Sequence, residues 1–243
     1  EDCEVEGSIG HGIMAGVGIM NASNKTKFLD PAKRIAFRRL SVHHTVNNND
    51  HTKSPWGSAV KLNNAKYGII EDCYVHDNGG EGIDLDNAWQ VIIQGNISAN
   101  NRANIYLDKA SGVSVRNNLC YYTSRPSANI FLSMEVYSAL VRDLFLVDID
   151  IENNVLFGSN GVAFWQGTVS AIQRAHFHSI HIRHNTMIGK TLTGSGMLHF
   201  AYAVSGGKPV QNVSIKNLSF TNNIVSAHPD SVRTLVTGPL NPQ

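Results

Sequence analysis

The sequence predicts an all-β protein built as a parallel β-solenoid, in which short strands stack coil upon coil. Segments with period-two alternation recur every 22 to 23 residues, as Cys73, Asn96 and Asn118 show, with Asn or Gly at the corners. A unit of this length cannot bury its apolar face alone, so it must stack on its neighbours. Helical repeats are excluded because alternation dominates and no 3.6-residue stripe persists.

The first strand of the repeat reads apolar, x, apolar, polar, polar, and then Asn or Cys. Five segments share this pattern: 68–75, 91–98, 113–120, 149–156 and 180–187. Segments 35–42 and 213–220 fit with Leu in the last of these places. The opening "EDCEV" matches "EDCYV" at 71–75, so the chain begins inside a repeat.

A second short strand follows most of these segments. Its members are 11–15, 58–62, 81–85, 103–107, 128–132, 160–164 and, more loosely, 196–200. Longer gaps between repeats mark insertions. We expect one domain over 1–243 with about eight coils, as a piece of a longer chain truncated at both ends. Flanking domains of the same chain are expected partners, because open solenoid ends expose the core.

The segments "GIDLDNAWQVIIQGNIS" and "NIYLDKASGVSVRNNLC" resemble the right-handed parallel β-helix repeat of the pectin-lyase-like superfamily. The resemblance covers nearly the whole chain. It implies a right-handed, single-stranded β-helix with a substrate groove over the "GIDL" strands, and a secreted or cell-surface protein that acts on a polysaccharide or oligosaccharide. The superfamily includes lyases, hydrolases, epimerases, tailspikes and non-catalytic surface proteins, so the fold leaves the activity open.

Equivalent residues of stacked coils lie about 4.8 Å apart, so each position of the repeat becomes a column. Asn96, Asn118, Asn154 and Asn185 form one column, which resembles the family's internal asparagine ladder and is expected to be structural. Two positions earlier runs an outward column of mostly alternating charge, expected to pair across strands: Glu1, Arg38, Glu71, Gln94, Arg116, Glu152, Arg183 and Lys216.

Two further outward columns belong to the "GIDL" strands. One reads Met14, Lys61, Asp84, Tyr106, Phe131, Ala163 and His199, and the next reads Asn63, Asp86, Asp108, Ser133 and Trp165. Asp86 and Asp108 are like charges on adjacent strands, which is unfavourable unless a cation or a shared proton relieves the repulsion. Three readings of the acidic stretch follow: a solvated or cation-capped face of the strands, a catalytic site, or a dedicated calcium site.

Proton abstraction is the first chemistry that these residues suggest. Beta-elimination or C5 epimerisation of a uronate needs a base and a positive group that neutralises the carboxylate. Lys61, His76, His43 or Tyr106 could be the base or acid. Calcium, which prefers oxygen ligands, could be held by Asp84, Asp86 and Asp108.

Hydrolysis by a carboxylate pair is the second possibility. Asp86 and Asp108 lie one strand spacing apart, and Asp84 and Asp86 are two residues apart; these separations lie near the ranges for retaining and inverting glycosidases. The alternative is a non-catalytic glycan-binding or structural module. Aromatic and amide side chains that could contact sugars are Trp56, Trp89, Tyr106, Phe131, Trp165 and Asn63.

His43 and His76 share a column at the start of the loops that lead into the groove strands. A zinc site is not indicated by the sequence, because three or four converging ligands are not evident. The three cysteines, an odd number, fit no metal-ligand spacing. A formal net charge of +1 and the absence of a basic run argue against nucleic acid, and no apolar stretch approaches the roughly 18 residues of a membrane span.

Overall fold

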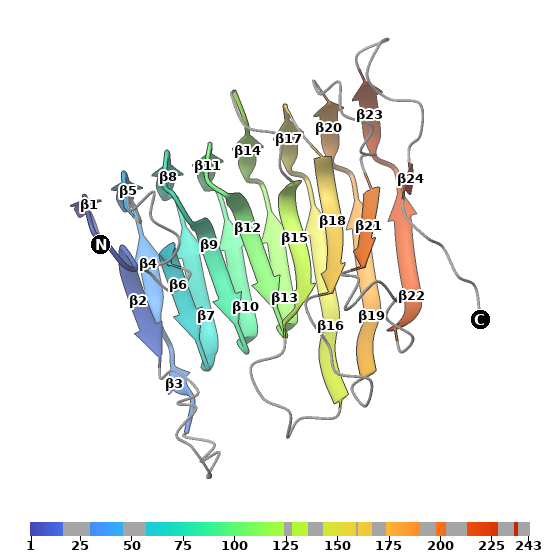
Figure 1. The fold of residues 1–243 in the computed structure, drawn as a ribbon, viewed down its shortest axis with the longest axis horizontal. Helices are drawn as coiled ribbons and strands as arrows, with labels where there is room; N and C mark the ends of the chain where they lie inside the picture. The colour runs from blue at the N-terminus through green and yellow to red at the C-terminus, as the bar shows by residue number, and fades with distance from the viewer. Residues whose placement is uncertain are drawn as a thin grey trace.

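The computed structural model describes residues 1–16, 30–45, 57–123, 128–135, 143–158, 160–166, 174–189, 198–202, 213–227 and 236–237. These residues form three parallel β-sheets and no helix. We call them sheets A, B and C. The strands are stacked along one axis from the N-terminal to the C-terminal end of the chain (Figure 1).

Sheet A is made of eight short strands. In spatial order they are β1 (Glu4–Glu6), β5 (Ser41–His43), β8 (Tyr74–His76), β11 (Ile97–Ala99), β14 (Leu119–Tyr121), β17 (Val155–Phe157), β20 (Thr186–Gly189) and β23 (Ile224–Ala227). Sheet B also has eight strands: β2 (Ile13–Gly16), β6 (Ser58–Asn63), β9 (Glu81–Asp86), β12 (Ala103–Asp108), β15 (Ala128–Met134), β18 (Asn160–Gln166), β21 (Leu198–Tyr202) and β24 (Val236–Thr237).

Sheet C contains the longest strands. They are β3 (Ala32–Lys33), β4 (Ala36–Arg38), β7 (Ala65–Glu71), β10 (Trp89–Gln94), β13 (Ser111–Arg116), β16 (Asp143–Glu152), β19 (Arg174–Arg183) and β22 (Val213–Thr221). Both β3 and β4 pair with β7. The chain visits the sheets in the repeating order B, C, A, so each coil contributes a strand to each sheet. The predicted all-β solenoid is therefore confirmed.

The core lies inside the three sheets and is filled by every second residue of each strand. Ile83 and Leu85 of β9, and Val91 and Ile93 of β10, are all 0% exposed. Because side chains alternate across a strand, the residues between them face outward. Burial of this apolar surface, at about 25 cal/mol per Å², drives the stacking of the coils.

The corners between sheets B and C require a left-handed backbone. Asn64, Asn87 and Lys109 occupy equivalent corners with φ of 46°, 53° and 50°. Asn tolerates this conformation because its short side chain can hydrogen-bond locally, whereas other residues with a Cβ lose about 1–2 kcal/mol. Lys109 thus stands at a corner where its backbone is disfavoured.

The predicted asparagine ladder is confirmed at the corner between sheets C and A. Asn96 donates from its backbone N–H and its Nδ2 to Oδ1 of Asn118, both at 2.9 Å. Asn118 makes the same pair of bonds to Asn154, and the pattern continues through Asn185 to Asn223. The side-chain amide of each coil therefore fixes the register of the next.

A second buried amide network, which the sequence analysis did not identify, lies where sheet A leads into sheet B. Asn78 Nδ2 donates to Oδ1 of Asn101 at 2.8 Å, and Asn101 Nδ2 donates to Oδ1 of Asn104 at 3.1 Å. Asn104 in turn donates to Asn129 at 3.0 Å. These residues are nearly fully buried and stabilise the coils on the side of the groove.

The predicted alignment of segment 213–220 is wrong by five residues. Val213 pairs with Ala175 and Leu218 pairs with Ile180, so the repeat starts at Leu218 and its ladder residue is Asn223. Lys216 lies beside His178 and does not continue the outward charged column. The cause is that β22 begins before the repeat does. Residues 213–217 show the same alternation of apolar and polar residues as the repeat that starts at Leu218, so the sequence pattern fits both alignments.

Replacing Asn118 with Ala tests the ladder. The substitution leaves the backbone N–H of Asn96 and the carbonyl of Ile93 without their partners. We expect the free energy of unfolding to fall by about 2–4 kcal/mol, because each buried unpaired group costs about 1–3 kcal/mol. Urea denaturation followed by circular dichroism measures the change. Ser114→Ala, at a half-buried position of the same coil, serves as a control, and an equal loss in both variants would contradict a specific role for the ladder.

Candidate active site on the outer face of sheet B

The two groove columns are formed as the sequence predicts. Lys61, Asp84 and Tyr106 are in register on β6, β9 and β12, and the column continues through Phe131, Ala163 and His199. The neighbouring column joins Asn63, Asp86, Asp108, Ser133 and Trp165. The register therefore places the predicted residues on one face of sheet B.

The three acidic residues on this outer face are buried, although they lie on the side of the sheet away from the core. Asp84 is 3% exposed, Asp86 7% and Asp108 1%. A carboxylate in such a position needs a partner, because an unpaired buried charge costs several kcal/mol. The face is therefore not an ordinary solvated side of a strand.

Lys61 provides one partner for the acidic residues. Its Nζ lies 2.7 Å from Oδ2 of Asp84 and 3.8 Å from Oδ2 of Asp86. Burial lowers the pKa of Lys61, but the charges of these two carboxylates outweigh that effect and raise the pKa above its usual range. Lys61 is consequently an ammonium ion at neutral pH, suited to neutralise negative charge and unsuited to act as a base.

Lys109 is the second cation of the site, and the sequence analysis did not single it out. Its Nζ lies 3.2 Å from Oδ1 of Asp86 and also contacts Oδ2 of Asp108. Burial lowers the pKa of Lys109, but attraction to Asp108 and Asp86 raises it overall. The sequence did contain a sign that Lys109 is unusual. It has "DK" at 108–109 where the preceding coil has "DN" at 86–87, so a lysine replaces the asparagine that this corner favours.

Asp108 combines a buried carboxyl group with an opposing charge. Burial raises its pKa to about 8, and the nearby carboxylate of Asp86 also raises it, while Lys109 acts in the opposite direction. Oδ1 of Asp108 accepts a hydrogen bond of 2.8 Å from the backbone N–H of Glu135. The repulsion expected between Asp86 and Asp108 is thus relieved by both a cation and a proton.

Glu81 and Ser58 extend the network toward the start of the strands. Burial raises the pKa of Glu81 to about 7, and the charge of Asp84 adds to the effect. The Ser58 hydroxyl donates to Oδ2 of Asp84 at 2.6 Å and lies 3.4 Å from Oε2 of Glu81. Ser58 was not among the predicted residues, because a single serine at a strand start has no sequence signature.

Tyr106 lies next to Asp84 in the first column. Its hydroxyl donates to Oγ of Ser133 at 2.7 Å, and its ring centroid is 5.8 Å from that of Phe131. Burial raises the pKa of Tyr106 above its usual range, and the charges of Glu135 and Asp108 raise it further. The phenol therefore stays protonated at neutral pH and donates its hydrogen bond to Ser133.

His11 approaches the same site from the first coil. Its Nδ1 accepts a hydrogen bond of 2.9 Å from the backbone N–H of Ser58, so the neutral ring has its proton on Nε2. Burial lowers the pKa of His11, and the charge of Lys61 lowers it further, which favours this neutral form. The sequence analysis did not identify His11 as part of the site.

Asn63 leaves an acceptor without a donor beside these charges. Its Oδ1 is buried and accepts no hydrogen bond from the described residues. Asp86, its neighbour in the column, has Oδ1 facing only the Lys109 ammonium at 3.2 Å. Buried acceptors of this kind are rare in native structures, and a ligand with hydroxyl groups would supply the missing donors.

His43 and His76 are not brought into this network. They are stacked on sheet A, with ring centroids 5.0 Å apart. The imidazole of His43 lies beside Glu4 and Glu6, and that of His76 lies beside Asp77. Trp56 lies outside the described residues, and of Trp165 only the backbone in β18 is described.

The calcium site predicted at Asp84, Asp86 and Asp108 remains a prediction. Their carboxylates are the oxygen ligands that calcium prefers, but Lys61 and Lys109 already contact them. Within the described part of the chain, these three residues do not form a group whose ligand atoms all lie within 4.8 Å of one another. We therefore assign calcium no role in the chemistry below.

The fold defines the class of protein. The chain matches the family described as "Right handed beta helix region" over residues 1–125 and 39–232, and it belongs to that family. The predicted right-handed parallel β-helix is thereby confirmed. No curated protein matches the chain in sequence.

Two solved structures from Azotobacter vinelandii are similar to the chain. The A-module of mannuronan C-5 epimerase AlgE4 superposes with a TM-score of 0.52 at 13% identity, over 96% of this chain and 71% of that one. The A-module of AlgE6 gives a TM-score of 0.36 at 12% identity, over 98% of this chain and 73% of that one, which is too low to compare the folds. At this identity the likeness to AlgE4 concerns the fold alone.

The described residues contain no helix that is long and apolar enough to cross a membrane.

The raised pKa of Glu81 predicts how stability depends on pH. The folded chain keeps a proton on Glu81 up to about pH 7, whereas an unfolded chain releases it near the usual value of 4.5. Stability should therefore fall as the pH rises from 5 to 8, by at most about 3 kcal/mol from this group. Glu81→Gln should flatten this decline in urea denaturation. Asp148→Asn, at an exposed carboxylate of sheet C, should leave it unchanged; an undiminished decline in Glu81→Gln would contradict the assignment.

Proposed function

We propose that this chain modifies an acidic polysaccharide outside the cell by moving the proton at C5 of a uronate residue. The reaction takes place on the outer face of β6, β9 and β12. The observation that carries the proposal is the buried network of lysines and carboxyl groups on that face, in which two carboxyl groups have a pKa near neutrality. Strongly perturbed ionisable groups gather at functional sites more often than elsewhere.

Lys61 neutralises the substrate carboxylate. An ammonium has three N–H donors, and Asp84 occupies one of them at 2.7 Å. A second donor can bind the uronate carboxylate, which withdraws electrons from C5 and makes its proton more acidic. Asp84 and Asp86 hold the ammonium in position, and the acceptor of Asn63 receives a sugar hydroxyl.

Glu81 and Tyr106 move the protons. The C5–H bond breaks, the proton passes to the Glu81 carboxylate, and the electron pair is delocalised into the uronate carboxylate beside Lys61. For epimerisation, the Tyr106 phenol returns a proton to C5 from the opposite face. For β-elimination, the C4–O bond breaks instead and Tyr106 protonates the departing oxygen. A base with a pKa of about 7 is well matched to work at neutral pH.

The fold supports this class of reaction without specifying it. AlgE4, whose A-module shares the β-helix fold, is named a mannuronan C-5 epimerase. A mannuronan is a polymer of uronate residues, so the same class of substrate is a reasonable first choice for this chain. The proposal for this chain rests on its own residues, because one fold hosts many activities.

Hydrolysis is the second candidate, and Asp108 is the observation that favours it. A carboxyl group with a pKa of about 8 remains protonated at neutral pH and could donate a proton to a glycosidic oxygen. Asp86 and Asp108 contact the same ammonium of Lys109, so the two groups are close together, as a carboxylate pair requires. Asp86 would then act as the nucleophile or base.

Solvent exchange separates the two reactions. The chain is incubated in D₂O with a panel of uronate polymers, and NMR measures deuterium at C5 together with unsaturated and reducing ends. Lys61→Gln should lower C5 exchange by about 10²–10⁴-fold, because it removes the charge that stabilises the intermediate. Lys66→Gln, on sheet C of the same coil, should retain full exchange.

The remaining outcomes decide between the alternatives. Reducing ends without C5 deuterium, lost in Asp108→Asn, would replace the proposed reaction with hydrolysis. Binding of the polymers without any product would instead make the chain a glycan-binding module. Exchange that is equal in Lys61→Gln and the wild type would remove Lys61 from the mechanism.

A further inference from the structure

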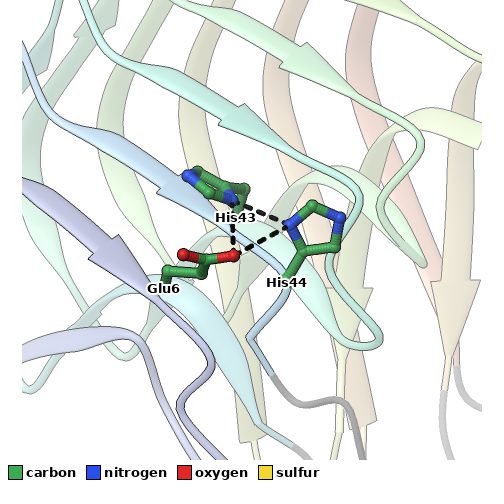
Figure 2. A group of neighbouring side chains, drawn as sticks. All are labelled: Glu6, His43 and His44. Carbon is green, nitrogen blue, oxygen red and sulfur yellow. Dashed lines mark hydrogen bonds and ion pairs between the residues drawn. The ribbon is translucent and has the colours of Figure 1, made fainter.

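Three metal-ligand side chains converge at the N-terminal end of sheet A (Figure 2). His43 Nδ1 lies 2.8 Å from His44 Nδ1. Oε1 of Glu6 lies 4.0 Å from the first nitrogen and 3.8 Å from the second. Among the described residues, this is the one group of three or more His, Cys, Asp or Glu side chains whose ligand atoms all lie within 4.8 Å of one another.

The backbone explains why these side chains meet. Strand β1 pairs with β5 so that Glu6 lies opposite His43, 37 positions further along the chain. His44 follows the end of β5 with a left-handed φ of 52°. Successive side chains of a strand point to opposite faces, but this turn brings the two imidazoles edge to face, with centroids 5.0 Å apart.

Glu4 fixes the proton position of His43. Its Oε1 lies 2.9 Å from Nε2 of His43, and an ionised carboxylate can only accept, so Nε2 is the nitrogen that bears the proton. In the neutral ring the lone pair is then on Nδ1, which faces His44 and Glu6. A ligating histidine usually donates its other N–H to a carboxylate in this way.

The Nδ1 atoms of His43 and His44 are so close that a proton or a metal ion must lie between or beside them. Since His43 Nδ1 is the acceptor, His44 Nδ1 must supply the proton between them. A metal ion would take the place of that proton, which would move to Nε2 of the neutral His44 ring, and would draw in the Glu6 carboxylate. Ligand atoms of a tetrahedral zinc ion, with bonds of about 2.1 Å, are about 3.4 Å apart. The three observed separations, 2.8, 3.8 and 4.0 Å, lie on both sides of this value.

We propose that Glu6, His43 and His44 form a binding site for a zinc ion, with Glu4 as the positioning residue for His43. Two imidazoles and a carboxylate are a ligand set that zinc uses in proteins, with a fourth position open to water. Imidazole ligands favour zinc and its first-row neighbours over calcium and magnesium. Zinc was not favoured from the sequence, because Glu6 joins the site through strand pairing and His44 through a turn.

The site is distinct from the groove chemistry proposed above. Its interactions join β1 to β5 of sheet A, whereas the network of Lys61 and Lys109 lies on sheet B. Zinc held there would bridge the first two coils of the described chain and so stabilise their pairing. Among the described residues, His76 lies beside both imidazoles, and Asp77 and Tyr74 contact His76 in turn.

Metal titration of the untagged full chain tests the proposal. Cobalt(II), which reports tetrahedral coordination by strong visible absorption, should bind in a 1:1 ratio, and zinc should displace it. Zinc should also raise Tm, because it binds the folded chain through residues of two coils that the unfolded chain does not hold together. These readouts are independent of any activity on polysaccharides.

Substitutions assign the ligands. His44→Ala and Glu6→Gln should each weaken zinc binding by more than about 10-fold, and Glu4→Gln should weaken it by about 10–100-fold through loss of the outer hydrogen bond. The side chains of His44 and Glu6 are 52% and 63% exposed, so both variants should fold, as circular dichroism can verify.

His178→Ala is the matched control. His178 lies on sheet C, where its Nε2 is 3.1 Å from Oγ of Ser214, and its loss should leave zinc affinity unchanged. Absence of saturable 1:1 binding to the wild-type chain would overturn the proposal. So would wild-type affinity in both His44→Ala and Glu6→Gln.

Discussion

Parallel pairing of each coil with the next is the constraint on which the structure depends. Backbone pairing holds equivalent residues about one strand spacing apart. Each side chain therefore contacts the equivalent side chain of the next coil, which is either similar or complementary to it. The asparagine ladder from Asn96 to Asn223 fixes the register at one corner, and the amide network from Asn78 to Asn129 fixes it at another. An apolar column thereby becomes a continuous core, and a charged column becomes a row of interacting charges.

The outer face of sheet B shows the cost of this constraint. In-register pairing brings Asp86 beside Asp108, and burial would make that repulsion worse. The chain relieves it with Lys109, which takes a strained corner to reach both carboxyl groups, and with a raised pKa of about 8 for Asp108. Apolar residues at these positions would need neither the cation nor the raised pKa, so the buried charges add no evident stability to the fold.

The sequence predicted the columns correctly because alternation and repeat length are strong signals, and Lys61, Asp84, Tyr106, Asp86 and Asp108 lie where expected. The prediction from the sequence was wrong where the pattern of alternation fitted more than one alignment. The alternation of β22 allowed two alignments of residues 213–220, and only strand pairing selects between them. Glu81 and Ser58 were not recognised as parts of one network, because their link to Asp84 is made by side-chain oxygens at the start of the strands.

The sequence by itself determined the solenoid, its register over most coils and the position of the acidic columns on sheet B, since each follows from a periodic pattern of residue types. Only the tertiary structure decided which charges are buried, which carboxyl groups keep a proton near pH 7, and that His43 faces Glu6 and His44. These properties depend on side-chain directions and on contacts between distant segments. A left-handed turn at His44 and the pairing of β1 with β5 create the proposed metal site, and neither has a periodic signature in the sequence.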